Sequence, residues 1–169
     1  VIIFSFREIN AYLFVYIQSK IKLNSPTRLF DILENQVKTL PVKRALNTKY
    51  NGRWISTSSE EFLERSNQIS RGLLQLGLRK GDKVAIISSN NRTEWCIVDV
   101  GVLQIGGIDV PIYPTINAKD YAYIINHSES KYCFVSDQEV FDKIKTIKKE
   151  CPNLKEVYSF DEIKGCKHW

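Results

Sequence analysis

KVAIISSNNRTEWCIVDVGVLQIGGIDVPIYPT, residues 83–115, decides the fold. Residues 84–87 are continuously apolar, which indicates a buried strand rather than one with a face in water. Residues 93–105 are then apolar on nearly all sides, which is typical of a buried helix, and the Gly106-Gly107 pair ends it. A second apolar strand follows at 108–113. A strand, a helix and a strand with short connections predict a parallel βαβ unit.

Two prolines stand near the end of the second strand. Pro111 and Pro114 lack a backbone N–H, and each pushes the residue before it into extended backbone. We therefore expect residues 110–115 to leave the sheet as a stiff extended segment at the carboxyl end of the strand. Ligands of open α/β sheets usually bind at that edge. A strand exit that only positions the next helix would show the same pattern.

The alternation continues on both sides of this unit. Asn51-Gly52 predicts a type I′ turn, and hence a β-hairpin over residues 45–57. Ser58 and Glu61 form a capping box that begins a helix, and Asn117 can cap another. Further helices are expected at 27–40 and 138–149, and further strands at 131–136 and 154–160. The predicted fold class is α/β, a parallel sheet with flanking helices plus an N-terminal β-hairpin.

The composition is that of an ordinary globular domain. Of the 169 residues, 43% are hydrophobic and 25% are charged, which is enough apolar material for a core. The net charge of +5 is scattered, apart from a denser run of lysines that we interpret as a solvated helix face: Lys143, Lys145, Lys148 and Lys149. Aromatic residues do not interleave with these cations, so we expect no nucleic-acid partner.

The four cysteines and two histidines do not form a metal-binding pattern. No CxxC pair occurs, and His127 and His168 stand apart from the cysteines. Cys96 and Cys133 lie in apolar runs, so we interpret them as buried thiols in a reducing compartment. His127 stands at a predicted helix end, where a cation is favourable and no catalytic role is required.

Residues 1–24 differ from the rest of the chain. They are rich in Ile, Phe and Tyr but show no clean period of a helix or strand. Their longest apolar run, 11–17, is far shorter than the roughly 20 residues that span a bilayer. An extension outside the domain, an amphipathic packing segment and a membrane anchor all remain open. We place the domain at residues 25–169.

The sequence does not contain the familiar motifs of phosphate binding or nucleophilic catalysis. GxGxxG, GxxxxGK[ST] and GxSxG are all missing. The glycines of LGLRKGDK, residues 76–83, join a helix to a strand and therefore indicate a turn rather than a phosphate cradle.

Three segments together resemble a known family: LLQLGLRKGDKVAIISSNNRTEW (73–95), GVLQIGGIDVPIYPT (101–115) and YAYIINHSESKYCFVSD (121–137). In this order and spacing they resemble the N-terminal lobe of long-chain fatty-acid–CoA ligases of the AMP-forming, acyl-adenylate (AMP-binding) superfamily, and bacterial members in particular. The resemblance covers about residues 27–169. We therefore expect these residues to be a partial AMP-binding domain, truncated at its C-terminus.

The resemblance implies a two-step reaction. A fatty-acid carboxylate attacks the α-phosphate of ATP, and coenzyme A thiolate then displaces AMP from the acyl-adenylate. It implies ATP, magnesium and coenzyme A as cofactors, a long-chain fatty acid as substrate, and a cytoplasmic enzyme with peripheral membrane contact. The phosphate loop, the magnesium-binding acid and the catalytic lysine of such enzymes lie beyond the matching segments. No catalytic, cofactor or metal residue is therefore assigned, and the chain alone is expected to be inactive.

The residues that carry the resemblance look like scaffold of the N-terminal lobe that could border the acyl site: Asn91, Arg92, Trp95, Pro111, Tyr113, Pro114 and Thr115. Two other functions remain open. One is a non-catalytic α/β module that binds a partner or an acyl ligand. The other is an enzyme of another acyl-adenylate branch. Chain-length preference and oligomeric state are not determined by these residues.

Overall fold

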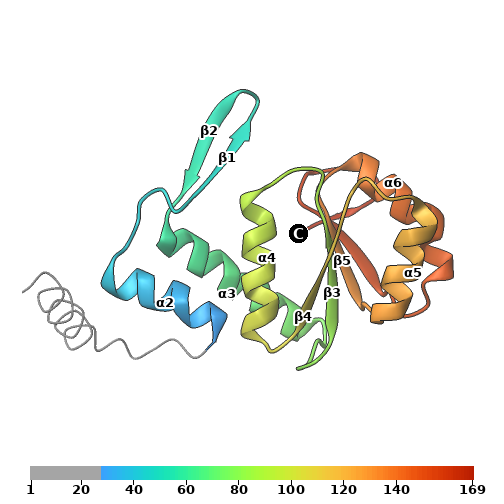
Figure 1. Cartoon of the computed structure of the whole chain (residues 1–169), viewed down its shortest axis with the longest axis horizontal. Helices are drawn as coiled ribbons and strands as arrows, with labels where there is room; N and C mark the ends of the chain where they lie inside the picture. Colours follow the sequence, from blue (N-terminus) through green and yellow to red (C-terminus); the bar gives the residue numbers. More distant parts are fainter. Residues whose placement is uncertain (1–27) are drawn as a thin grey trace, which may run out of the picture.

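The computed structural model describes residues 28–169, so the interpretations of residues 1–24 lie outside it. The chain order of helices, strands and one short 3₁₀ helix can be followed in Figure 1: α2 (Leu29–Thr39), β1 (Leu46–Tyr50), β2 (Arg53–Thr57), α3 (Ser59–Gln75), β3 (Lys83–Ile87), α4 (Thr93–Gln104), β4 (Ile108–Ile112), α5 (Ala118–Ser128), β5 (Tyr132–Val135), α6 (Gln138–Ile147), η1 (Lys148–Glu150), β6 (Glu156–Ser159) and β7 (Lys167–His168).

The main sheet is parallel throughout. Its five strands lie in the order β4-β3-β5-β6-β7, and β1 and β2 form a separate antiparallel hairpin. The predicted α/β class, with a parallel sheet, flanking helices and an N-terminal hairpin, is confirmed. The short strand β7 was not predicted, because two residues are too few to show a period.

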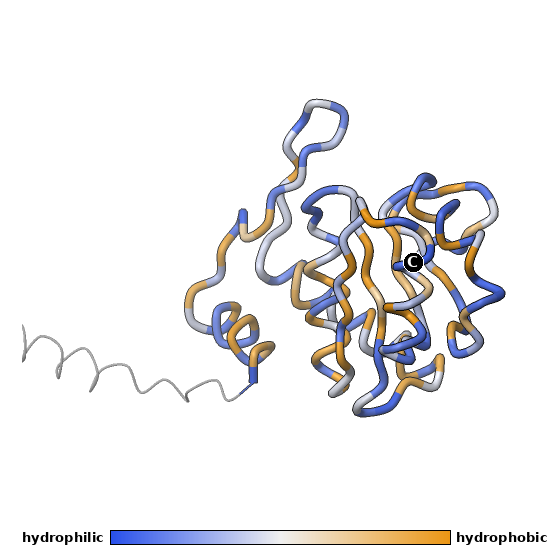
Figure 2. The backbone as a smooth tube through the Cα atoms, turned by 45° about the vertical axis from the view of Figure 1, so that its right-hand side comes forward, coloured by the Kyte–Doolittle hydropathy of each residue, from blue (hydrophilic) through white to orange (hydrophobic). Residues whose placement is uncertain are grey.

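The central strands divide their side chains between two cores. Along β3, Ala85 and Ile87 face helices α5 and α6, whereas Val84 and Ile86 face α3 and α4. This alternation follows from the pleat of a strand, and burial on both faces explains the continuous apolar run. Hydrophobic colour accordingly follows the central strands of the tube in Figure 2.

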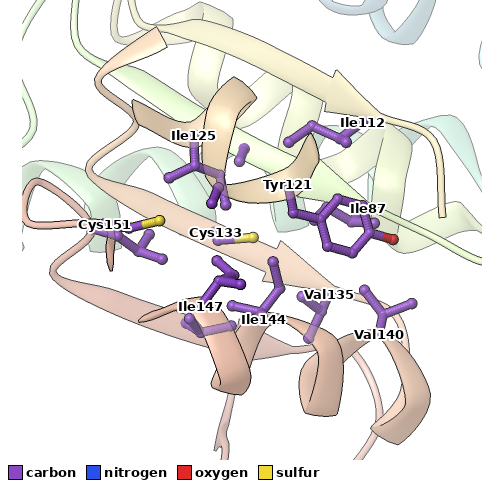
Figure 3. Packing of buried hydrophobic residues seen from close by; sticks show 14 of the residues in the cluster. Ile87, Ile112, Tyr121, Ile125, Cys133, Val135, Val140, Ile144, Ile147 and Cys151 are labelled. Carbon is purple, nitrogen blue, oxygen red and sulfur yellow. The ribbon is translucent and has the colours of Figure 1, made fainter. Parts of the chain in front are cut away.

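The face under α5 and α6 is closed. Tyr121 and Ile125 from α5 belong to the same core over this face as Ile144 from α6, and all three are fully buried. Figure 3 shows them packed around Cys133 and its neighbours on β5. The predicted burial of the Cys133 thiol is confirmed, whereas Cys96 on α4 is partly exposed.

The face under α3 and α4 contains more aromatic side chains and is partly open. Tyr132, Phe134 and Phe160 belong to this core. Beside them an open groove of about 380 Å³ runs between α3 and the outer strands, and Tyr158 and Trp169 contribute to its walls.

Helix α4 is held close to both α3 and the sheet. None of its twelve residues is exposed, which confirms the helix predicted to be buried on most sides. Gly101 permits the contact with α3, because a Cβ at this position would meet Ile69 Cγ2 at 2.6 Å. The Ser70 hydroxyl of α3 donates to the Gly101 carbonyl at 2.9 Å and fixes the two helices in register. This packing positions the first turn of α4 at the carboxyl edge of the sheet.

The predicted turn and cap signals are confirmed. Asn51 and Gly52 both have positive φ, as the type I′ turn requires. Ser58 accepts a hydrogen bond from the Glu61 backbone N–H at 3.1 Å, and the Glu61 carboxylate accepts one from the Ser58 N–H. Asn117 caps α5 through the Asp120 N–H.

The prolines behave differently from the prediction at one position. Pro111 does not lie outside the sheet: it lies within β4, opposite Ile86. The strand tolerates it because β4 is an edge strand, whose backbone needs ladder partners on one side only. The chain leaves the sheet after Ile112, so the exit comprises Tyr113 and Pro114.

Helix α2 forms as predicted, but most of its apolar stripe is not covered by the described residues. Leu33 is buried, whereas Leu29 and Leu40 are 72% and 69% exposed.

The four lysines predicted to form a solvated helix face differ in their surroundings. Lys143 and Lys148 reach Glu139 and Glu156, while the other two lysines are exposed.

Candidate functional site

The strand order places a switch point at the carboxyl edge of the sheet. The chain leaves β3 for β4 on one side and then returns to β5 on the other side. Ligands of doubly wound sheets bind where the order reverses in this way, beyond the carboxyl ends of the strands. The segments after β3, β4, β5 and β6 all meet at this edge, and they contain the residues singled out from the sequence.

A chain of hydrogen bonds joins the ends of β3 and β5. The Ser89 backbone N–H donates to Ser136 Oγ at 2.9 Å, and that hydroxyl donates to Asp137 Oδ2 at 2.6 Å. Asp137 also caps α6 by accepting from the Val140 N–H at 3.1 Å. Burial alone would raise the pKa of Asp137, but these hydrogen bonds hold it below its ordinary value. Asp137 is therefore an ionised helix cap rather than a free acid.

Arg92 forms the centre of a second network at the same edge. Its guanidinium donates to Glu94 at 3.0 Å, to Asp161 at 2.8 Å and to the Ser136 carbonyl at 3.1 Å. It also donates to the Tyr50 hydroxyl at 3.1 Å. These partners come from the hairpin, from α4 and from the segments after β5 and β6. The planar fork of arginine suits such multiple bonding better than a lysine would.

The centre of the network is buried, and its one cation faces two carboxylates. The Arg92 and Glu94 side chains are only 7% and 12% exposed. Burial would lower the pKa of Arg92, but Asp161 and Glu94 more than reverse that effect and raise it. Burial would likewise raise the pKa of Glu94, but the bonds from Arg92 and Tyr50 lower it overall. Both groups therefore stay charged and immobile, which suits a structural clamp rather than proton transfer.

Aromatic rings complete the surroundings of the guanidinium. Arg92 lies 5.4 Å from the centroid of the Tyr50 ring and 5.6 Å from that of Phe160. The Tyr50 hydroxyl also donates to the Glu94 carboxylate. Burial, and then the bond to Glu94, raise the pKa of Tyr50 above its ordinary value.

A groove of about 360 Å³ lies on the other side of the first turn of α4. Five of the seven residues that carry the family resemblance line it, together with Ser88, Asn90 and Ile112: Asn91, Trp95, Pro111, Tyr113 and Pro114. The Tyr113 ring is 80% exposed. The groove thus offers an aromatic and aliphatic wall with amide and hydroxyl groups at its rim.

The exit segment that forms one wall of the groove is anchored from beneath. The Pro114 carbonyl accepts a hydrogen bond from the Tyr121 hydroxyl at 2.8 Å and one from Lys143 Nζ at 3.2 Å. Burial of the Tyr121 ring raises the pKa of its hydroxyl to about 12, so this donor keeps its proton. Two stiff prolines and two donors therefore fix the backbone while leaving the Tyr113 ring free to meet a ligand.

The predicted residues thus separate into two groups. Five of them line the groove, Arg92 lies in the buried network, and Thr115 is exposed and does not line the groove. Sequence reasoning missed Tyr50, Ser136 and Asp161 as partners of Arg92. They lie 42, 44 and 69 positions away in the chain, so no local pattern connects them.

The carboxylates at this edge do not fit a magnesium site. Glu94 and Asp161 are bound to Arg92, and Asp137 caps a helix. Among residues 28–169, no group of three or more His, Cys, Asp or Glu side chains could hold a metal ion.

His127 stacks on Tyr123 of its own helix, with ring centroids 5.6 Å apart.

Comparison with known proteins agrees with the resemblance seen in the sequence. The AMP-binding enzyme family matches residues 33–167. A long-chain-fatty-acid–CoA ligase, ACSBG2 of Xenopus laevis, is 29% identical over 140 residues, which are 82% of this chain and 19% of the frog protein. Fatty acyl-CoA synthetase A of Dictyostelium discoideum is 32% identical over 111 residues, 66% of this chain and 16% of that protein. The chain thus spans less than a fifth of the length of these relatives.

Solved structures show the same fold. The anthranilate CoA ligase AuaEII in complex with anthranoyl-AMP aligns with a TM-score of 0.67 and 25% identity, over 82% of this chain and 25% of its own. A fatty acyl CoA synthetase of Mycobacterium tuberculosis aligns with a TM-score of 0.66 and 21% identity, over 78% of this chain and 26% of its own.

The relatives come from eukaryotes as well as bacteria, so the specific likeness to bacterial members is not supported. The family match itself extends from α2 to β7 and includes both the Arg92 network and the groove. The chain therefore belongs to the AMP-binding enzyme family, the acyl-adenylate-forming enzymes.

Proposed function

We propose that this chain is the N-terminal part of a long-chain fatty-acid–CoA ligase, which converts ATP, a fatty acid and coenzyme A into acyl-CoA, AMP and pyrophosphate. The observation that carries the proposal is the match to relatives named as long-chain-fatty-acid–CoA ligases over 106 to 140 residues. The matched family region contains the complete carboxyl edge of the sheet, which supports a shared role for this edge.

Two parts of the edge contribute differently to that function. The Arg92 network fixes the ends of β5 and β6 and the start of α4. The groove beside Trp95 and Tyr113 is the wall that this chain contributes to a ligand site of the whole enzyme. Magnesium would find its ligands elsewhere in the enzyme, because the carboxylates at this edge are already bonded. The phosphates of ATP and coenzyme A would likewise find their cations elsewhere, because Arg92 is already bonded to Glu94 and Asp161. The chain alone is therefore expected to be inactive.

A second candidate is a ligase of another acyl-adenylate branch. One solved structure, which is 25% identical to this chain, is that of an anthranilate CoA ligase. An aromatic acid is therefore the rival substrate. The wall of Trp95 and Tyr113 suits a flat ring as well as an acyl chain. A non-catalytic module that binds a partner or an acyl ligand is the third candidate.

A cytoplasmic location with peripheral membrane contact remains a prediction. Within residues 28–169, no helix is both long enough and apolar enough to cross a bilayer.

The test is an assay of the natural gene product that contains these residues. Purified protein is given ATP, magnesium, coenzyme A and either hexadecanoate or anthranilate, and the release of AMP and acyl-CoA is measured. We expect kcat/KM for hexadecanoate to exceed that for anthranilate by at least about tenfold. The opposite preference would assign the protein to another branch, and no thioester from any acid would contradict the ligase proposal.

A further inference from the structure

The Pro114 carbonyl connects the segment that leaves β4 to two helices. It accepts a hydrogen bond from the Tyr121 hydroxyl of α5 at 2.8 Å and one from Lys143 Nζ of α6 at 3.2 Å. Tyr121 belongs to the core under α5 and α6, whereas Trp95, which lines the groove, packs against the core under α3 and α4. The two donors therefore hold the exit segment from the face of the sheet opposite Trp95.

The exit segment is a short arch with both ends in the core. Ile112 before it is buried, and Ile116 after it packs against the core that contains Tyr121. Tyr113 and Pro114 between them line the groove, and the Tyr113 ring is 80% exposed. The bonds to the Pro114 carbonyl thus fix the middle of the arch, directly after the residue whose ring is available to a ligand.

Packing alone does not require a hydroxyl at position 121. The Tyr121 ring is fully buried among apolar side chains, and Figure 3 shows its hydroxyl oxygen at the edge of that cluster, away from Cys133. A phenylalanine ring would fill the same space and leave the Pro114 carbonyl without this donor. The ring of Tyr121 therefore belongs to the core, whereas its hydroxyl acts on the arch.

Lys143 differs in the same way from its neighbour on α6. The Lys143 side chain is 33% exposed, and its Nζ lies 3.1 Å from Glu139 Oε1 as well as within hydrogen-bond distance of the arch. Glu139 lies one helical turn before it, so this ion pair favours the side-chain conformation that reaches the Pro114 carbonyl. Lys145, two positions further along, is exposed.

We propose that Tyr121 and Lys143 are positioning residues, which act on a substrate of the enzyme through the Tyr113 ring. Their role rests on the proposed function of the groove as a wall of the ligand site. An arch that is fixed before the ligand arrives avoids the cost of being ordered upon binding, and this cost corresponds to about threefold to tenfold in affinity. A purely structural role would instead stabilise the fold without changing how tightly a substrate is held.

The experiment is steady-state kinetics of the natural gene product that contains these residues, with ATP, coenzyme A and hexadecanoate each varied in turn. Tyr121→Phe removes the hydroxyl and keeps the ring, and Lys143→Met removes the ammonium group and keeps the aliphatic stem. We expect each change to raise the same KM that Tyr113→Ala raises, by about threefold to tenfold, with kcat changed by less than about twofold. Lys143→Arg keeps a cationic donor and should restore most of the loss.

A double-mutant cycle separates positioning from stabilisation. If the Tyr121 hydroxyl acts through the Tyr113 ring, Tyr121→Phe should lower kcat/KM by less than about twofold in a protein that already carries Tyr113→Ala. Two controls alter similar groups on the same helices. Tyr123→Phe removes a hydroxyl from a tyrosine that is 67% exposed, and Lys145→Met removes an exposed charge. Both should behave like the parent enzyme.

Hydrogen exchange of peptides that contain residues 112–117 measures the arch without any substrate. We expect faster exchange in Tyr121→Phe than in the parent protein or in Tyr123→Phe, because the arch has lost a donor. Failure of the parent protein to form a thioester would overturn the proposed function, whereas the exchange measurement would still report on the arch.

Three results would overturn the positioning role. The first is unchanged exchange of these peptides in Tyr121→Phe, which would show that the donor does not fix the arch. The second is a Tyr121→Phe enzyme with the KM values of the parent. The third is a fall in kcat/KM that is equal with and without Tyr113→Ala, because the effect would then not pass through the Tyr113 ring.

Discussion

The two sides of the first turns of α4 differ in how their polar groups are matched. On the side facing the hairpin, Glu94 is buried against Arg92, and its pKa is lowered. On the face that carries Trp95, one turn further along the helix, burial raises the pKa of Asp99 to about 6, and the neighbouring Asp109 adds to the effect. One helix therefore carries an enclosed network around Arg92 on one side, and on the other a groove wall followed one turn later by a carboxyl group whose ionised form is disfavoured by burial.

From this difference we propose a structural role for Arg92 and a ligand-contacting role for Trp95, within a single short motif. Arg92 and Trp95 are three positions apart, yet Arg92 is enclosed by bonded partners whereas Trp95 lines an open groove. The closed side can hold the carboxyl edge in one arrangement. The open side is then free to vary with the ligand, so substitutions on the two sides should have different consequences.

The largest effect is expected from Arg92→Ala. The change leaves the buried Glu94 carboxylate without its cation, which typically costs about 3–5 kcal/mol in the free energy of unfolding. Urea unfolding of the variant and the parent chain measures the loss. Arg71→Ala is the matched control, because its ion pair with Glu64 is about 60% exposed on both sides and should contribute less than about 1 kcal/mol.

A double variant keeps this prediction testable if Arg92→Ala does not fold. Adding Glu94→Gln removes the unpaired charge, so the double variant should recover part of the lost stability. An Arg92→Ala protein that unfolds at the same urea concentration as the parent would show that the network is not a clamp.

A smaller effect is expected from Asp99→Asn, and it depends on pH. The ordinary pKa of Asp99 is 3.8, so the folded protein holds this proton more tightly between pH 3.8 and about 6. The contribution of Asp99 to stability should therefore fall as pH rises through that window and stay level above it. Asp99→Asn should remove this contribution and gain roughly 1 kcal/mol over the parent chain at neutral pH, because partial exposure screens part of the cost.

Asp142→Asn is the control for this measurement, since Asp142 is an exposed carboxylate on α6. Thermal unfolding at a series of pH values from 4 to 8 should give parallel curves for this control and the parent chain. Because carboxylates with lowered pKa values, such as Glu94 and Asp137, act in the opposite direction, the comparison is between the parent chain and Asp99→Asn. A stability difference between these two proteins that stays constant across the window would contradict the assignment of Asp99.

Local chemistry explains which parts of the fold could be predicted. The Asn51-Gly52 turn, the Ser58 cap and the apolar runs of β3 and α4 are decided by neighbouring residues, and all were predicted correctly. The position of Pro111 was not predicted correctly. Whether a strand lies at the edge or in the centre of a sheet depends on the order of the strands and not on the sequence of that strand.

The candidate site was half predictable for the same reason. The groove residues lie at the ends of adjacent strands, so the parallel topology brings Trp95 and Tyr113 together. The partners of Arg92 come from segments up to 69 residues away, and an aspartate such as Asp161 carries no local sign of its partner. Long-range pairing of this kind depends on the completed fold.

The most direct test of the two-sided account is the activity of Tyr113→Ala in the natural gene product. Tyr113 is 80% exposed, so its loss should leave the melting temperature unchanged while lowering kcat/KM for acyl-CoA formation by about tenfold or more. Tyr123→Ala, which removes another exposed tyrosine outside the groove, should change neither quantity. A Tyr113→Ala enzyme with full activity would contradict the assignment of the groove as the functional side of the motif.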